Sequence, residues 1–221
     1  MNFSDILNKY PPYARICENL NNTPISVSGV VESAQSQLIF ALANKNNSSA
    51  VVVTYSDMEA RAMYSDLSFY TDNAVYFPSK EYVFYNIETS ARSNENIRLA
   101  AVDKLINNEN CICVTSVDAL LQYTADKTVF EEFVIEFRLG KRFELEKLTE
   151  QLIVMGYTRE DIVEGEGQFS VRGGIIDIFS PNYENPLRIE FFDDETDSIR
   201  AFDAYSQRSL EKMETARVIP V

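Results

Sequence analysis

Six of the seven glycines in this 221-residue chain fall between Gly140 and Gly174. Glycine adopts positive φ angles and lets two backbones approach closely, so such a concentration marks tight turns. In the densest part, from Gly167 to Phe179, apolar residues alternate with polar ones around a Gly173-Gly174 pair. This alternation is typical of half-buried strands joined by a short turn. The region is therefore expected to form a small antiparallel sheet.

Two further strand patterns follow at residues 187–192 and 198–202, with an acidic turn at 193–195 between them. An arginine interrupts each apolar strand of this region: Arg172, Arg188 and Arg200. An arginine in such a place is either solvated on the open face of a half-buried sheet or part of a recognition surface. The residues alone leave both interpretations open.

Strand periodicity assigns the residues of 187–192 to two faces, because successive side chains point to opposite sides. Counting from Arg188 places Glu190 and Phe192 beside it on an outer face. The core face then holds Leu187, Ile189 and Phe191. An exposed phenylalanine beside charged residues calls for a partner. The alternative is that a neighbouring element buries Phe192 and that Arg188 pairs with Glu190 or Asp193.

The first half of the chain alternates expected strands with expected helices. Strand patterns occupy residues 24–29, 50–55, 75–77 and 111–115. Helical patterns occupy residues 33–45, 57–70, 94–107 and 116–121. The β-branched run 50–55 is typical of a strand covered on both faces, and Asp57 is a plausible N-cap of the next helix. Repeated β-α-β units predict an open parallel sheet with helices on both faces.

The pattern changes near residue 127. A strand is expected at 130–137 and a helix at 143–155, followed by the short antiparallel strands described above. This order indicates a smaller α+β domain inserted into the first. The expected fold class is therefore α/β, with an open, mostly parallel sheet flanked by helices and a smaller inserted α+β domain.

Composition narrows the classes of function. A formal net charge of -14 argues against duplex nucleic-acid binding, since such domains neutralise phosphates with clustered lysines and arginines. The chain has no histidine, which removes Ser-His-Asp and Cys-His catalysis and histidine-ligated metals. Its three cysteines are odd in number, which suits a reducing cytoplasm, and no metal site is expected from them. No stretch approaches the roughly 20 apolar residues of a membrane span.

The segment from Gly29 to Ser36 lies where a phosphate-binding P-loop would open the first long helix. The spacing fits, with Gly29 in the first glycine position and Ser36 in the Ser/Thr position. Ala34 stands where the second glycine should be, and Gln35 where the lysine should be. The lysine supplies positive charge to the β- and γ-phosphates, and the glycine permits the backbone cradle. The loop thus has the position of a nucleotide site without its chemistry, unless the match is chance.

With both parts in view, the chain resembles the N-terminal part of the bacterial transcription-repair coupling factors, which is similar to the nucleotide-excision-repair helicase subunit UvrB. The residues that carry the resemblance are 167–181, 186–195, 197–200 and 206–210. The first half matches more loosely, through the degenerate P-loop and residues 76–85. UvrB itself would carry a working P-loop and a long aromatic-rich hairpin, for which residues 79–94 are too short. The coupling factors are therefore the better match, and the chain is expected to be an N-terminal fragment of one.

The resemblance implies a non-catalytic recruitment module that binds UvrA through a UvrB-like surface. In the family this surface is masked by the remaining domains until the protein is remodelled on stalled RNA polymerase. Carried over by motif position, the UvrA-binding residues are Arg172, Arg188 and Phe192. The alternative for both arginines is a structural ion pair. ATP, Mg²⁺, DNA and RNA polymerase are expected to bind only the absent domains, and the location is expected to be cytoplasmic, with no membrane partner.

The resemblance also implies domain borders. Residues 1–126 correspond to UvrB domain 1a with its degenerate P-loop, and residues 127–202 to the UvrA-binding domain 2. Residues 203–221 would return to the first domain. The competing hypothesis is a vestigial ATP-binding or helicase fragment with weak nucleotide or DNA binding, in which Ser36 still ligates Mg²⁺.

Overall fold

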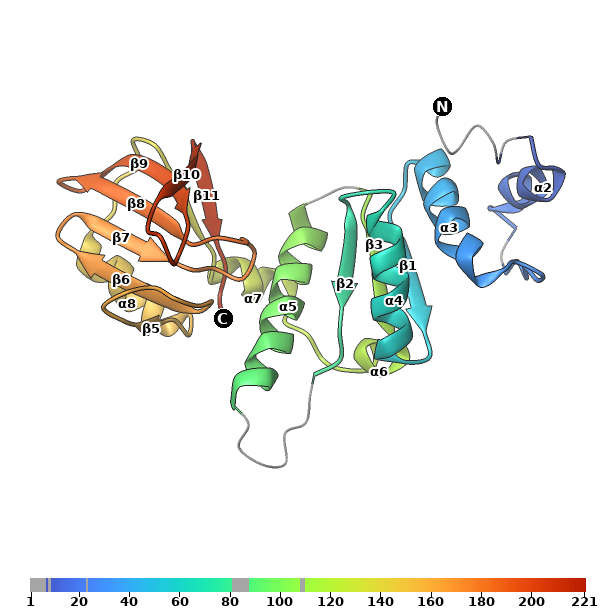
Figure 1. Ribbon diagram of the computed structural model, residues 1–221, viewed down its shortest axis with the longest axis horizontal. Coiled ribbons are helices and arrows are strands. Elements are labelled where there is room, and N and C mark those ends of the chain that lie inside the picture. Colours follow the sequence, from blue (N-terminus) through green and yellow to red (C-terminus); the bar gives the residue numbers. More distant parts are fainter. Residues whose placement is uncertain (1–6, 8, 23, 81–87, 108–109) are drawn as a thin grey trace. The chain divides into compact units, whose positions relative to one another are not determined.

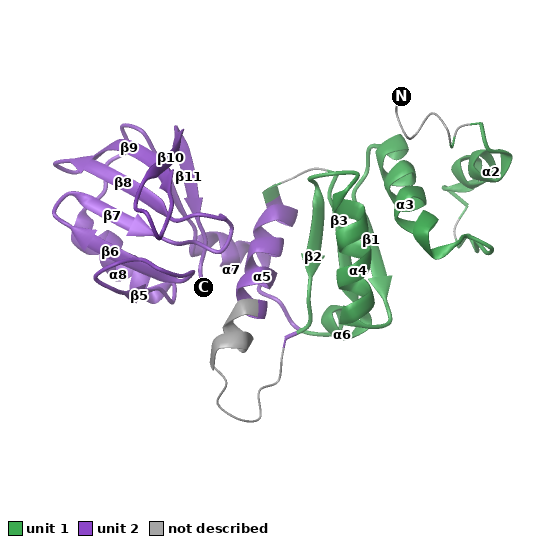
Figure 2. Ribbon diagram, viewed as in Figure 1, with its two compact units in different colours: residues 1–79, 107–122 green, residues 80–106, 123–221 purple. Residues whose placement is uncertain are grey.

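The computed structural model describes residues 7, 9–22, 24–80, 88–107 and 110–221, without the side chains of 88–93. The chain forms two compact units (Figure 2). The first consists of residues 1–79 and 107–122, and the second of residues 80–106 and 123–221. The part of the loosely matching stretch 76–85 that follows residue 80 falls outside the described residues.

The first unit is built around a three-stranded parallel sheet (Figure 1). Its strands are β1 (Ala50–Thr54), β2 (Ala74–Phe77) and β3 (Ile112–Ser116), in the order β1-β3-β2. Its helices are α2 (Pro11–Asn19), α3 (Glu32–Asn46), α4 (Asp57–Ser68) and α6 (Val117–Leu120). The parallel pairing of β3 with both neighbours confirms the parallel sheet that the β-α-β alternation predicts.

The core of this unit lies where α4 packs on the sheet. Ala60 and Leu67 of α4 are fully buried and belong to one core cluster with Val114 in the central strand. All five residues of β3 are buried, but β1 alternates. Val51 and Val53 on its second face are 64% and 46% exposed. The expectation that 50–55 is covered on both faces is therefore wrong, because the described chain leaves one face of β1 uncovered.

Two further expectations for this unit need correction. Residues 24–29 form no strand, since nothing in the described chain pairs with them and Val27 is 46% exposed. The N-cap of α4 is Ser56, whose side chain accepts a hydrogen bond from the N–H of Glu59. Asp57 is instead the first helical residue. Its carboxylate accepts hydrogen bonds from Ser79 and Ser116, at the ends of the neighbouring strands.

The described residues of the second unit form two mainly antiparallel sheets and three helices (Figure 1). Its helices are α5 (Glu88–Asn107, whose last residue falls in the first unit), α7 (Lys127–Glu132) and α8 (Leu145–Val154). A six-stranded sheet has the order β10-β9-β8-β7-β6-β5, and β11 pairs with β4. The strands are β4 (Ile135–Arg138), β5 (Thr158–Arg159), β6 (Gln168–Arg172), β7 (Ile175–Ile178), β8 (Leu187–Phe192), β9 (Glu195–Phe202), β10 (Ser209–Met213) and β11 (Thr215–Val218). The run β6 to β9 is antiparallel, as the sequence predicts.

The core of this unit lies between α8 and the inner face of the sheet. Leu148 and Leu152 of α8 belong to one buried cluster with residues from successive strands. The fully buried strand residues include Phe169, Ile176, Ile178, Leu187 and Ile189. Burying a side chain of this size stabilises a fold by about 1.5 to 3 kcal/mol, so this layer holds the outer face of the sheet in place.

The expected single strand at 130–137 is wrong. Asp126 accepts a hydrogen bond from the N–H of Thr128 at 2.8 Å and caps α7, which runs to Glu132 before β4 begins at Ile135. Asp at an N-cap stabilises a helix by satisfying a free N–H.

Arg217 in β11 joins three elements of this unit. Its guanidinium pairs with Asp103 of α5 at 2.7 Å, Glu131 of α7 at 2.9 Å and Glu136 of β4 at 2.9 Å.

Residues 203–221 lie in the second compact unit, where β10 pairs with β9 and β11 pairs with β4. The borders expected after residues 126 and 202 follow the domains of UvrB rather than compactness, and they stay predictions.

Candidate functional site: the outer face of the small sheet

Strand register brings the residues singled out in the sequence onto one face. One cross-strand row runs over Ser170, Asp177, Arg188 and Arg200. The next row runs over Arg172, Ile175, Glu190 and Ser198. Residues directly opposite each other in adjacent strands share a face, as do residues two apart in one strand. Arg172 and Arg188 are therefore neighbours on the outer face, although 16 positions separate them in the chain.

Asp177 in β7 is the centre of this face. Its side chain is only 2% exposed and accepts hydrogen bonds from both arginines. Arg188 binds it with two bonds, Nε to Oδ1 at 2.7 Å and Nη2 to Oδ2 at 2.9 Å. Arg172 adds a bond from Nη2 to Oδ2 at 2.6 Å. A buried carboxylate needs such partners, because an unpaired one loses several kcal/mol of hydration.

Arg188 contacts Asp177, Gln207 and Phe202. Its side chain is 14% exposed, and Nη2 also donates to Oε1 of Gln207 at 2.9 Å. The guanidinium lies 4.3 Å from the centre of the Phe202 ring. The hydrogen bonds with Asp177 raise the pKa of Arg188 above its ordinary value. The structural alternative for Arg188 is thus present, but with Asp177 rather than with Glu190 or Asp193.

Arg172 and Phe192 are much more accessible. The side chain of Arg172 is 50% exposed and makes one bond to Asp177, and Phe192 at the end of β8 is 76% exposed. The expected division of faces in β8 is confirmed, since Leu187 and Ile189 are buried while Arg188 and Glu190 are partly exposed. The alternative that Phe192 is buried is wrong within the described chain.

Arg200 belongs to a separate pair. Its guanidinium contacts the carboxylate of Glu190, which also accepts a hydrogen bond from Ser198 at 2.7 Å. Arg200 is about three-quarters buried. This arrangement agrees with a structural role for Arg200.

Asp177 and Gln207 are the residues of this face that the sequence interpretation missed. A signal for Asp177 was available, because a single carboxylate interrupts the apolar run 175–178. A charge in a buried strand requires a partner, and arginines on adjacent strands are the candidates. Gln207 carries no such signal, because it is a loop residue, with a positive φ of 58°.

The degenerate P-loop segment has a different geometry from the one its position suggests. No strand precedes it among the described residues. Helix α3 begins at Glu32, so Ala34, Gln35 and Ser36 all lie within the helix. The N–H of Ala34 donates to the carbonyl of Val31 at 2.9 Å. Ser36 is 2% exposed. Gly29 has a φ of +79°, in the left-handed region that glycine tolerates.

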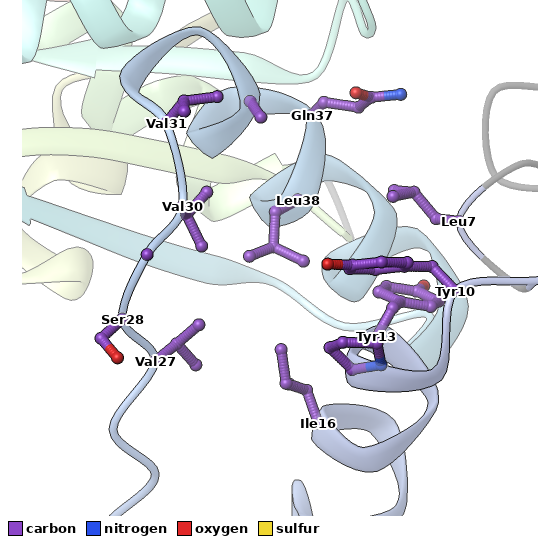
Figure 3. A pocket seen from close by; sticks show the side chains of 13 residues that line it. Leu7, Tyr10, Tyr13, Ile16, Val27, Ser28, Val30, Val31, Gln37 and Leu38 are labelled. Carbon is purple, nitrogen blue, oxygen red and sulfur yellow. The ribbon is translucent and has the colours of Figure 1, made fainter.

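An apolar hollow of about 260 Å³ lies beside this segment (Figure 3). Side chains of α2, α3 and the intervening chain point into it, mainly Tyr10, Tyr13, Ile16, Val27, Val30 and Leu38. None of the described residues that line it is a lysine or arginine. A bound triphosphate is neutralised by such cations or by Mg²⁺, so this lining offers little to a nucleotide.

The described residues offer little to two other classes of site. No group of three or more potential His, Cys, Asp or Glu ligands in that part of the chain could hold a metal ion. None of its helices combines the length and apolar character needed to cross a bilayer.

Known proteins resemble the chain over both units. The UvrB interaction domain family matches residues 135–221. A transcription-repair-coupling factor of Bacillus subtilis is 34% identical over 196 residues, which cover 88% of this chain and 17% of the relative. Relatives of the same name from Staphylococcus haemolyticus and Myxococcus xanthus are 28% and 29% identical over 97% and 95% of the chain. The chain spans less than a fifth of the length of each of these three relatives.

Proposed function

Since this chain belongs to the transcription-repair-coupling factor family, we propose that it is the module with which such a protein recruits UvrA to stalled RNA polymerase by presenting a UvrB-like surface. The match of residues 135–221 to the UvrB interaction domain supports this proposal. The proposed docking surface is the outer face of β6 to β9, which lies wholly within the matched residues.

The observation that carries the proposal is the combination of an exposed aromatic and an exposed arginine on one rigid sheet. Phe192 and Arg172 are 76% and 50% exposed, and both stand on strands whose other face is core. Aromatic residues and arginines dominate binding energy at protein interfaces, above all when the supporting structure is preorganised. We assign direct contact with UvrA to these two side chains.

Arg188 has a different part in the proposal. Its bonds to Asp177 and Gln207 leave 14% of the side chain exposed, so it holds Asp177, and Asp177 in turn holds Arg172. Arg188 is thus a positioning residue whose remaining exposed edge adds to the contact. Arginine suits this work because its planar fork binds a carboxylate with two parallel bonds.

The module is proposed to act without catalysis. The first unit would be a helicase-like domain whose loop from Gly29 to Ser36 has lost its nucleotide site. ATP, Mg²⁺, DNA and RNA polymerase would be bound by other parts of the full-length protein, in the cytoplasm, and those parts would mask the docking surface. The apolar lining of the hollow beside α3 supports the loss of the nucleotide site.

Titration of purified UvrA into this chain tests the proposal. The variants Arg172→Ala and Phe192→Ala should each weaken binding by about tenfold or more, as hot-spot truncations do. A matched control is Arg159→Ala, an exposed arginine of the edge strand β5 that is opposite Phe169 of the core face in the strand register, and it should leave the affinity unchanged. Circular dichroism on each variant verifies folding. Full affinity in a folded double variant of Arg172 and Phe192 would refute the proposed surface.

A further inference from the structure

The loop between β9 and β10, residues 203–208, is tightly folded. The N–H of Asp203 donates to the carbonyl of Arg208 at 2.9 Å, and the N–H of Gln207 donates to the carbonyl of Asp203 at 2.8 Å. The carboxylate of Asp203 accepts a hydrogen bond from the N–H of Ser206 at 2.7 Å. Gln207 has a φ of 58°, in the left-handed region, where a residue other than glycine persists only when surrounding contacts fix it. The loop is therefore a preformed turn.

The side chain of Gln207 ties this loop to the proposed docking surface. Its Nε2 donates to the carbonyl of Ala204 inside the loop at 2.7 Å, and its Oε1 accepts from Nη2 of Arg188 at 2.9 Å. One amide thus bonds to the loop through its donor and to the sheet through its acceptor. An ionised glutamate would lack the donor, and a lysine would lack the acceptor. The amide holds the loop and Arg188 in one arrangement.

The outer face of the sheet continues into this loop. Phe202, the last residue of β9, is two positions after Arg200 and so shares the outer face with it. Phe202 is nevertheless fully buried, and the guanidinium of Arg188 lies 4.3 Å from the centre of its ring. Because Gln207 bonds to that same guanidinium, the loop is packed on the side of the sheet that carries the docking surface.

Tyr205 is the most accessible side chain of the loop. It is 98% exposed, and Arg208 is exposed as well. A single exposed apolar residue needs no explanation by itself. Here the loop repeats what Phe192 and Arg172 form on the sheet, an exposed aromatic and an exposed arginine on a preorganised support. Tyrosine and arginine are the residue types that dominate binding energy at protein interfaces.

The size of a stable interface includes this loop. Phe192 pairs with Glu195 at the start of β9, and the loop begins where β9 ends. At roughly 3.3 Å per residue, the eight residues of β9 span about 26 Å. A standard interface buries about 800 Å² of each partner, a patch roughly 30 Å across. A partner of this size that covers Phe192 and Arg172 therefore reaches the loop.

We infer that the loop 203–208 is a second contact region for UvrA, an inference that rests on the proposed function. Tyr205 is its contact residue. Gln207 is a positioning residue that fixes the loop against Arg188. The surface that binds UvrA then extends along β9, from Phe192 at one end to Tyr205 at the other.

The first test is Tyr205→Ala in the UvrA titration. The affinity should fall by about tenfold, as for other aromatic hot spots. The thermal midpoint of the free chain should not change, because the side chain is 98% exposed. The matched control is Tyr123→Ala, since Tyr123 is 95% exposed and lies before α7, outside the sheet. Wild-type affinity in Tyr205→Ala, or an equal loss in both variants, would overturn the inference.

The second test is Gln207→Met, which keeps the length of the side chain and removes both hydrogen bonds of its amide. The affinity should fall severalfold, because the loop is no longer fixed against Arg188. In the Tyr205→Ala background the same substitution should cost clearly less, since the contact that it positions is already absent. A double-mutant cycle measures this coupling. An undiminished loss would contradict the role of Gln207 in positioning the loop.

The outcomes separate this inference from the proposed function. If Arg172→Ala and Phe192→Ala weaken binding but Tyr205→Ala does not, the docking surface ends at the sheet and the inference fails alone. If the wild-type chain does not bind UvrA at all, the proposed function and the inference both fail. A loss in Tyr205→Ala that its Tyr123 control lacks supports both.

Discussion

Replacing Arg188 with alanine is expected to lower the free energy of unfolding by about 3 kcal/mol, within the range for breaking a buried ion pair. The variant loses the contact with the Phe202 ring and two charge-assisted hydrogen bonds to Asp177. Each such hydrogen bond contributes up to about 1.5 to 3 kcal/mol. Asp177, with 2% exposure, would keep only Arg172 as a charged partner. Arg172→Ala should cost less than about 1 kcal/mol, because that side chain is half exposed.

Urea denaturation measures this difference. Tyrosine fluorescence is a suitable signal, since the chain has 12 tyrosines and no tryptophan. In a thermal melt, about 3 kcal/mol corresponds to a fall in midpoint of roughly 6 to 12 °C for a chain of this size. Equal losses for the Arg172 and Arg188 variants would refute the reasoning, because they would mean that burial does not set the strength of these pairs.

Two further predictions concern the strand ends and the turns. Burial alone would raise the pKa of the Asp57 carboxyl, but hydrogen bonds from Ser116 and Ser79 outweigh burial and hold this pKa below its ordinary value. The contribution of the Asp57 carboxylate to stability is therefore lost only as the pH falls through that lowered pKa. Ser79→Ala should raise this pKa, so that acid unfolding begins at a higher pH, and should cost about 1 kcal/mol near neutral pH, which pH-resolved urea curves would detect. Gly174→Ala should destabilise the chain, since an added Cβ would lie 2.9 Å from the carbonyl oxygen of Phe191, whereas Gly165→Ala meets open space and should be close to neutral in the same melts.

Local patterns in the sequence were enough wherever the structure itself is local. The alternation in 187–192 separates the buried face of β8 from its exposed face, because the period of a strand is a property of the backbone. The helix α3 follows from apolar spacing in the same way, and α4 and α8 lie where helices were expected. The parallel sheet follows from the order of its elements.

The errors arise where the outcome depends on a distant partner. The apolar pattern at 24–29 suits a strand, but a strand also needs a neighbour with free backbone groups, and the sequence does not show one. The run 50–55 has the composition of a covered strand, yet no described element covers the face of β1 that holds Val51 and Val53, and both are exposed. At 130–137 a local cap at Asp126 outweighs the strand pattern.

The candidate site shows the same contrast between what local patterns predict and what distant partners decide. Its residues could be named from a motif, but Asp177 was missed because strand register, rather than spacing in the chain, brings it between Arg172 and Arg188. The two arginines have the same side chain and the same expected role. Only the structure separates them, by exposures of 50% and 14%.

This separation changes how binding data on the surface should be interpreted. An affinity loss in Arg188→Ala would combine any missing contact with the effect of a partly uncompensated Asp177 on the position of Arg172. An equal loss in Arg172→Ala would have a simpler cause, the missing contact itself. The Arg172 side chain is half exposed, and Asp177 keeps its two bonds to Arg188 when Arg172 is removed. Because coupled residues are not additive, a double-mutant cycle of Arg172 and Arg188 in UvrA binding measures how much of the Arg188 effect passes through Arg172. If Arg188 acts by positioning, its removal should cost little affinity once Arg172 is already alanine; a full, independent loss would make Arg188 a direct contact.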